Sequence, residues 1–122
     1  MKLWLHRADD FNSDFDLQYR WYLEHANESV AERYLAAVRV TLQLLATQPD
    51  LGRRRKFRHP ALRDIRSFRL VSPFEVHLIF YRHSATELFA ERIMYGGRDL
   101  PRRLVEPPGQ DQVRAARARS TT

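Results

Sequence analysis

Hydrophobic residues recur at two different spacings in the two halves of this chain, and that change of spacing limits the folds it can adopt. In residues 9–47 they recur every three or four positions, the period of an amphipathic helix. In residues 65–95 they form short runs rich in β-branched and aromatic residues, separated by turn sequences, which is typical of strands. Helices and strands in separate segments predict an α+β domain.

Two helices are expected in the first half, over about residues 9–25 and about residues 30–47. Ser29 and Glu32 have the spacing of a capping box, in which each side chain satisfies a backbone donor of the first turn. Pro49 cannot continue the second helix and predicts its end. Because the connection between the helices is short, they should pack as an antiparallel hairpin.

Short strands account for the remaining hydrophobic residues. Val76, Leu78 and Phe80 form a purely apolar face of the middle strand, which we expect to meet the helices. His77 and Tyr81 lie on the opposite, mixed face, which should be partly open. The predicted architecture is strand, helical hairpin and three-stranded antiparallel meander (β-α-α-β-β-β) in two layers. The predicted strands are residues 2–6, 65–71, 75–82 and 87–95.

At 122 residues the chain should form one domain, over residues 1–105. Residues 106–122 begin with a Pro-Pro-Gly break and continue with small, polar and basic residues, so we expect a flexible tail. The chain lacks cysteine, and its histidines do not have metal-binding spacing with acids, so neither a metal nor a cofactor is expected. No apolar run approaches the ~18–20 residues that span a bilayer, and charge comes too early for a signal peptide. We expect a cytoplasmic protein without a membrane partner.

Positive charge is concentrated in the middle of the chain. Residues 53–69 carry eight Lys or Arg and one acid, whereas residues 1–52 carry five Lys or Arg and eight acids. Such a density favours binding to phosphate or another polyanion, and the alternative is a solvated loop rich in arginine. The candidate binding residues are Arg53, Arg54, Arg55, Lys56, Arg58 and Arg63.

Three segments carry a resemblance to a known family. Pro49-Asp50-Leu51-Gly52 closes the second helix, HLIFYR (77–82) forms the central strand, and RIMYGGRDL (92–100) ends the last strand. Together with the helical hairpin, these segments resemble the RelE/ParE superfamily of toxins from type II toxin–antitoxin systems, over about residues 2–104. The resemblance implies a small basic toxin neutralised by an antitoxin from an adjacent gene, whose C-terminal segment wraps the toxin. It implies no small-molecule substrate.

Two branches of that family have different targets. The ParE branch is associated with poisoning DNA gyrase, and the RelE branch cuts messenger RNA in the ribosomal A site. Tyr95 stands where ParE-like members often have His, and residues 100–104 lack the Tyr or His that RelE-type ribonucleases usually place near the C-terminus. The second difference favours the ParE-like branch. A non-toxic module that binds nucleic acid or a partner on the same fold is a further alternative.

RNA cleavage without a metal would need a base with a near-neutral pKa and cations that stabilise the phosphate. His77 and Tyr81 are four residues apart on one strand and should share a face, although both could simply line a half-open sheet. Arg98 could bind phosphate or could pair with Asp99. The candidate groups are His77 as base, Arg66, Arg82 and Arg98 as clamps, and Tyr81 or Tyr95 beside them.

Other large side chains allow a structural and a functional interpretation. Arg92 shares the strand parity of apolar residues, so we predict that it is partly buried and paired, either in the neighbourhood of Glu91 or with an acid on a helix. Trp4, Trp21 and Tyr22 are more aromatic surface than a small core readily hides. They could form an exposed groove for a partner's helix or strand, or could simply pack in the core.

Overall fold

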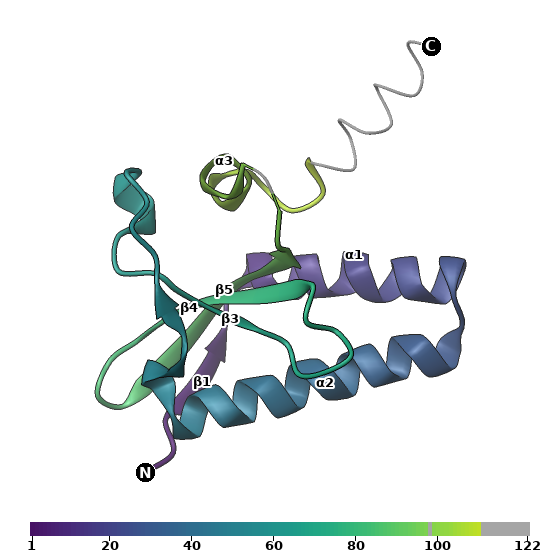
Figure 1. Cartoon of the computed structure of the whole chain (residues 1–122), viewed down its shortest axis with the longest axis horizontal. Coiled ribbons are helices and arrows are strands. Elements are labelled where there is room, and N and C mark those ends of the chain that lie inside the picture. Colours follow the sequence, from purple (N-terminus) through teal and green to yellow (C-terminus); the bar gives the residue numbers. More distant parts are fainter. Residues whose placement is uncertain (98, 111–122) are drawn as a thin grey trace.

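The computed structural model, which describes residues 1–97 and 99–110, is a five-stranded mixed sheet with two long helices on one side (Figure 1). The strand order is β1-β5-β4-β3-β2, with β1 parallel to β5 and every other pair antiparallel. This confirms the predicted α+β class, with strand, helical hairpin and antiparallel meander. The elements are β1 (Trp4–Arg7), α1 (Asp9–His25), α2 (Glu28–Thr47), the 3-10 turn η1 (Pro49–Leu51), β2 (Arg53–Arg54), the 3-10 turn η2 (Pro60–Leu62), β3 (Arg66–Arg69), β4 (His77–His83), β5 (Glu87–Tyr95) and α3 (Leu100–Val105).

The helical hairpin follows the prediction closely, except at the start of α2. Asn27 caps that helix, because its Oδ1 accepts a hydrogen bond from the backbone N–H of Val30 at 2.9 Å. Ser29 therefore lies inside the first turn, and the predicted capping box is wrong. Pro49 begins η1 directly after α2, as expected of a residue that cannot continue a helix.

The main hydrophobic core lies between the hairpin and one face of the sheet. The ring of Tyr34 on α2 stacks on that of Phe15 on α1 at a centroid distance of 5.4 Å, and joins the two helices. Burial of this apolar surface is the main stabilising term for a domain of this size. The largest contributors are Phe11, Tyr34, Leu42 and Leu45 from the helices and Ile79, Tyr81, Leu88 and Ile93 from the sheet.

The two faces of β4 are the reverse of the prediction. His77, Ile79 and Tyr81 face the hairpin and are buried, whereas Leu78 and Phe80 lie on the other face. The polar atoms of His77 and Tyr81 are satisfied by hydrogen bonds inside the fold, so their burial costs little. Both faces of β4 are apolar enough to be buried. A count of apolar residues therefore could not predict which face packs against the hairpin.

A second, smaller core covers part of the opposite face of the sheet. There α3 and η2 pack over Phe80, which is fully buried, together with Leu62, Leu100 and Leu104. The two-layer prediction is therefore incomplete, because it lacked α3 and the short edge strand β2. The cover does not extend over β2 and β3, whose outer face remains open beside α3 (Figure 1).

Candidate functional site

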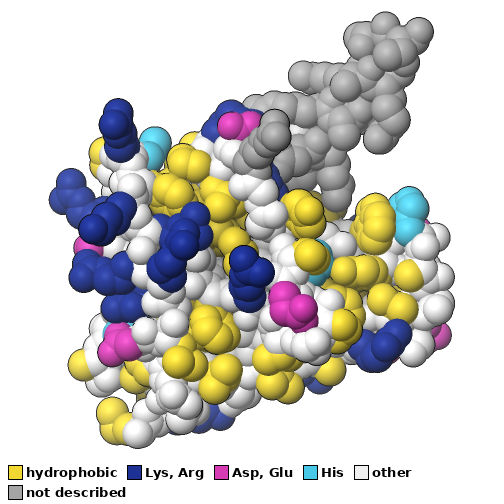
Figure 2. Space-filling view, in the orientation of Figure 1, with side chains coloured by type: hydrophobic (Ala, Val, Ile, Leu, Met, Phe, Trp, Pro, Cys, Tyr) yellow, Lys and Arg dark blue, Asp and Glu magenta, His cyan; other side chains and the backbone are white. Residues whose placement is uncertain are grey.

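The basic segment gathers on the open part of the sheet. Figure 2 shows Lys and Arg side chains massed over the region from β2 to β3, which is teal in Figure 1. Arg53 lies opposite Ser67 in the ladder, and the Nη1 of Arg55 donates to the Ser67 hydroxyl at 3.1 Å. These side chains and Arg69 share the face away from the hairpin. Arg54 lies opposite Arg66 and therefore points to the other side of β2. We call the basic surface formed by β2, β3 and the loop between them the cationic face; its members are Arg53, Arg54, Arg55, Lys56, Arg58, Arg63 and Arg69.

Most members of the cationic face are exposed and lack a carboxylate partner in residues 1–97 and 99–110. Arg54 forms an exposed ion pair with Asp64 at 3.2 Å. Burial, and then the nearby charge of Arg53, lower the pKa of Arg55, which also stacks over the Phe57 ring at 5.1 Å. The exposed members without an ion pair to another described residue are Arg53, Lys56, Arg58, Arg63 and Arg69. Like charges held together in this way create a field that attracts an anion.

Arg82 has a structural role, because it holds the backbone of the loop that carries part of the cationic face. Its Nε donates to the backbone carbonyl of Arg63 at 2.9 Å, and its Nη2 donates to that of Ala61 at 2.5 Å. Its Nη1 pairs with Glu91 on β5. Arg82 thus fixes the basic loop to the sheet, and its charge is already balanced by a carboxylate.

Arg66 and Tyr81 together hold the Pro49–Gly52 segment against the sheet. The Tyr81 hydroxyl donates to the Pro49 carbonyl at 2.6 Å and accepts from the Gly52 N–H at 2.8 Å. The Nη1 of Arg66 donates to the Gly52 carbonyl at 2.9 Å, and its Nη2 lies 3.3 Å from the Asp50 carboxylate. A Cβ on Gly52 would lie 2.3 Å from the Tyr81 hydroxyl oxygen, so only glycine fits. This contact gives the Pro-Asp-Leu-Gly sequence a structural role.

His77 lies inside an aromatic cluster on the face of the sheet that packs against the hairpin. Its Nε2 is 2.8 Å from the Tyr22 hydroxyl oxygen, and the rings of Tyr34 and Phe74 surround it. Burial lowers the pKa of His77 to about 4, so the imidazole is neutral near pH 7. His77 and Tyr81 share a face of β4, as predicted, but that face is the buried one.

A bulge in β5 directs Arg92 into a buried ion pair with α1. Tyr81 lies opposite Ala90 and Phe80 opposite Arg92, so Glu91 is the extra residue. The Arg92 Nε and Nη2 donate to the two carboxylate oxygens of Asp14 at 2.7 and 2.9 Å. This confirms the prediction of a paired Arg92 and identifies the helix acid. Burial raises the pKa of Asp14, and the bonds from Arg92 oppose that shift.

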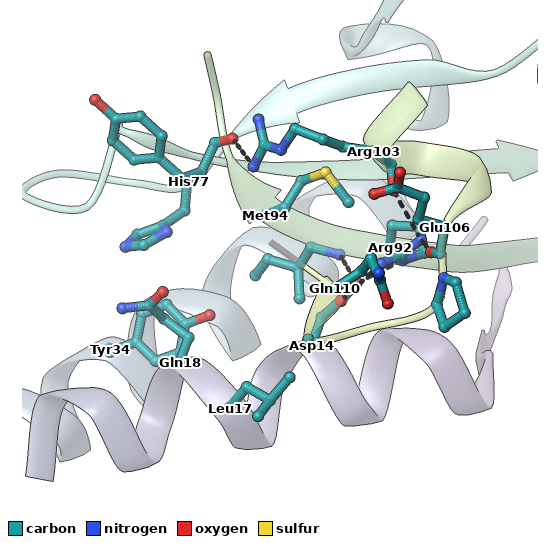
Figure 3. Close-up of a pocket in the computed structure, with 14 residues that line it drawn as sticks. Asp14, Leu17, Gln18, Tyr34, His77, Arg92, Met94, Arg103, Glu106 and Gln110 are labelled. Atoms are coloured by element: carbon teal, nitrogen blue, oxygen red, sulfur yellow. Dashed lines mark hydrogen bonds and ion pairs between the residues drawn. The ribbon is translucent and has the colours of Figure 1, made fainter. Parts of the chain in front are cut away.

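The same arginine connects the C-terminal segment to the domain (Figure 3). Arg92 Nη1 donates to the backbone carbonyl of Leu104, in the last turn of α3, at 3.0 Å and to that of Glu106, directly after the helix, at 2.7 Å. A cleft of about 160 Å³ lies beside this network, between α1, the end of β5 and residues 106–110. Residues 111–122, which form the rest of the predicted flexible tail, lie outside the described residues.

The comparisons with known proteins agree with this geometry. A sequence profile described as the ParE toxin of the type II toxin–antitoxin system parDE matches residues 5–100. The chain belongs to the ParE toxin family. The chromosomal ParDE toxin–antitoxin system from P. aeruginosa has the same fold, with a TM-score of 0.62 and 17% sequence identity over 79% of this chain and 98% of that chain. No curated protein sequence matches.

Within this ParE-family toxin, the structure brings the candidate catalytic residues together only in pairs, because Tyr95 lies opposite His77 and Arg66 lies opposite Tyr81 in the sheet. Arg66 and Arg82 hold backbone carbonyls, and His77 and Tyr81 are buried. Tyr95 is exposed at the end of β5, and Arg98 is outside the described residues. Asp14 was missed as the partner of Arg92, because the two residues are far apart in sequence.

An exposed aromatic groove lies at the other end of the toxin. Trp21 stacks on His25 at 4.6 Å, and both line the groove with Val76 and Tyr95. Tyr22 also lines this groove, but it is half-buried beside His77 and packs against the core. Trp4 is exposed on β1 and does not line the groove, so only Trp21 and Tyr22 of the three predicted aromatic residues lie in it. In residues 1–97 and 99–110, no three His, Asp or Glu side chains gather as metal ligands, and no helix could cross a membrane.

Proposed function

We propose that this ParE-family toxin arrests growth by binding a macromolecular target through its cationic face, and that a cognate antitoxin neutralises it by covering that face. The observation that carries the proposal is the group of exposed cations on the open side of the sheet, most of which have no ion pair with another described residue. The candidate contacts are Arg53, Arg54, Arg55, Lys56, Arg58 and Arg63. The site is an interface, and it requires no catalytic group.

DNA gyrase is the proposed target, in line with the ParE branch. The purified toxin should inhibit gyrase supercoiling, and the double variant Lys56→Glu/Arg58→Glu should lose that inhibition, because both side chains are exposed members of the cationic face. The matched control is Arg33→Glu/Arg39→Glu, which makes the same change of charge on the exposed side of α2. Full gyrase activity at excess toxin, or equal loss in both double variants, would contradict the proposal.

The proposed antitoxin is the product of an adjacent gene, with an acidic and apolar C-terminal segment. An acidic chain complements the cations, and apolar side chains fit beside Leu78 and Met94, which lie half-buried at the edge of the cationic face. Co-expression should restore growth, and the complex should dissociate more readily in high salt. Growth arrest that persists in the presence of every neighbouring small protein would refute this part of the proposal.

Cleavage of messenger RNA is the alternative function, and the same strains test it. His77 is buried, its pKa is low, and its side chain lies on the hairpin side of the sheet, whereas Arg53, Arg55 and Arg69 lie on the opposite side, so the alternative has little support. Primer extension after induction would reveal cleaved transcripts, and loss of cleavage in His77→Ala would assign the base. Harmless overexpression without any antitoxin would favour a non-toxic binding module instead.

A further inference from the structure

One edge of the sheet, the outer side of β1, has backbone groups that no other strand pairs. The Trp4 N–H donates to the Thr86 carbonyl and the Ala8 N–H to the Ala90 carbonyl, each at 2.9 Å. Alternate residues of a strand direct their backbone groups to opposite sides, so those of Leu5 and Arg7 point away from β5. Within the described part of the chain they have no backbone partner. An edge of this kind can pair with another strand.

Large aromatic side chains line the same edge. Trp4 is 76% exposed and Phe89 is 38% exposed, and the His6 ring stacks on Phe89 at 5.2 Å. Leu3 and Leu5 pack towards the main core, so Trp4 and His6 lie on the opposite face of β1. An exposed tryptophan beside an unpaired strand is typical of an interface rather than of free surface.

The distribution of charge identifies a second copy of this chain as the occupant. The order β1-β5-β4-β3-β2 places β1 at the sheet edge farthest from the cationic face. Charges near β1 are mixed, since Lys2 and Arg7 lie close in sequence to Asp9, and the His6 ring lies 3.8 Å from the Glu87 carboxylate. Two copies can therefore meet at β1 while their cationic faces stay apart. Pairing through β2 would bring those faces together.

We propose that this toxin self-associates by antiparallel pairing of β1 with β1 of a second copy, which joins the two sheets into one. The Leu3 N–H already donates to the Ala46 carbonyl on α2, so the outward groups without a backbone partner among the described residues are those of Leu5 and Arg7, and a two-fold register centred on Leu5 places it opposite Leu5 of the second copy. Trp4 then lies opposite His6 of the second copy, on the face where His6 stacks on Phe89. The edge is four residues long, so the contact is small and the dimer forms only at high concentration.

Sedimentation equilibrium of the full chain over a wide concentration series tests this inference. The wild type should shift from monomer to dimer as concentration rises. Arg7→Pro removes an outward N–H without a bond to β5, and Trp4→Lys replaces the exposed ring by a charge; both should remain monomeric. The control Val40→Lys changes an exposed apolar residue on α2 and should dimerise like the wild type.

Hydrogen exchange gives a second readout that does not depend on a variant. The Leu5 and Arg7 amides should exchange more slowly in concentrated than in dilute solution, whereas the Trp4 amide, already bonded to Thr86, should change little. If circular dichroism shows that Arg7→Pro is unfolded, Trp4→Lys and the hydrogen-exchange data still test the pairing of β1. A wild type that stays monomeric throughout, or a dimer that persists in folded Trp4→Lys, would overturn the inference. The result is independent of gyrase inhibition, so failure of one proposal leaves the other standing.

Discussion

Acid should destabilise this toxin through one buried histidine, His77. Burial among Tyr22, Tyr34 and Phe74 lowers the pKa of His77 from 6.5 to about 4 in the folded state, whereas the unfolded chain has the ordinary value. Between these pH values only the unfolded state binds the proton, so the free energy of unfolding falls as pH decreases. A difference of roughly 2.5 pH units, at about 1.4 kcal/mol per unit, predicts a total loss of about 3.5 kcal/mol, of which about 3 kcal/mol has occurred by pH 4.

Urea unfolding of the wild type and His77→Gln between about pH 7.5 and pH 4 measures this loss. Glutamine cannot titrate, and its side-chain oxygen can still accept a hydrogen bond from Tyr22. Burial raises the pKa of Asp14 and Glu91, which gives an opposite trend, but both residues are present in the two proteins and their effects cancel. The stability advantage of the wild type over His77→Gln should shrink by about 3 kcal/mol across the range.

The variant Tyr22→Phe distinguishes burial from the hydrogen bond as the cause. Burial alone accounts for the lowered pKa of His77, so this variant should keep most of the wild-type pH dependence. Parallel profiles for the wild type and His77→Gln from about pH 6.5 to pH 4 would mean that His77 is not held neutral in the fold, and would refute the reasoning.

The losses of stability in four further single variants can be measured by the same urea unfolding at pH 7. Asp14→Ala should cost about 3–5 kcal/mol because it leaves Arg92 charged and buried, whereas Arg54→Ala breaks an exposed pair and should cost less than about 1 kcal/mol; equal losses would contradict the burial argument. Tyr81→Phe leaves the Gly52 N–H unpaired and should cost about 1–3 kcal/mol. Gly52→Ala forces a methyl group against the Tyr81 ring and should cost about 1–3 kcal/mol. The double variant Tyr81→Phe/Gly52→Ala should lose less stability than the sum of the two single variants, because both substitutions act through the Tyr81 hydroxyl. Additive losses would disprove that coupling.

The helical hairpin and the three strands of the meander could be predicted because each depends on spacing within one segment. The faces of β4 could not, since the groups that satisfy its polar side chains come from distant segments. His77 bonds to Tyr22, which is 55 positions earlier, and Tyr81 bonds to Pro49 and Gly52, 32 and 29 positions earlier. A rule that compares the apolar content of strand faces assumes that His77 and Tyr81 are costly to bury. Their hydrogen bonds to distant segments of the chain remove that cost.

The short α3 was missed for a related reason. Its six residues include a proline near the start and two arginines, so an isolated segment of this kind would not form a stable helix in water. The helix is stable only because Leu100 and Leu104 pack on the apolar surface that η2 and Phe80 provide. Arg92 illustrates the intermediate case, because strand parity predicted its burial while only the tertiary structure could identify Asp14.

The arginines of the basic region divide into two groups, and the division strengthens the case for an interface. Arg66 and Arg82 use their guanidinium groups to hold the backbone carbonyls of Gly52, Ala61 and Arg63, so both ends of the basic segment are fixed to the sheet. A merely solvated loop would gain nothing from such anchoring. With its backbone held, the segment loses less conformational entropy when a partner binds, and more of the electrostatic attraction remains as affinity. Arg66 and Arg82 therefore hold the segment in the position in which the exposed members of the cationic face can bind a partner together.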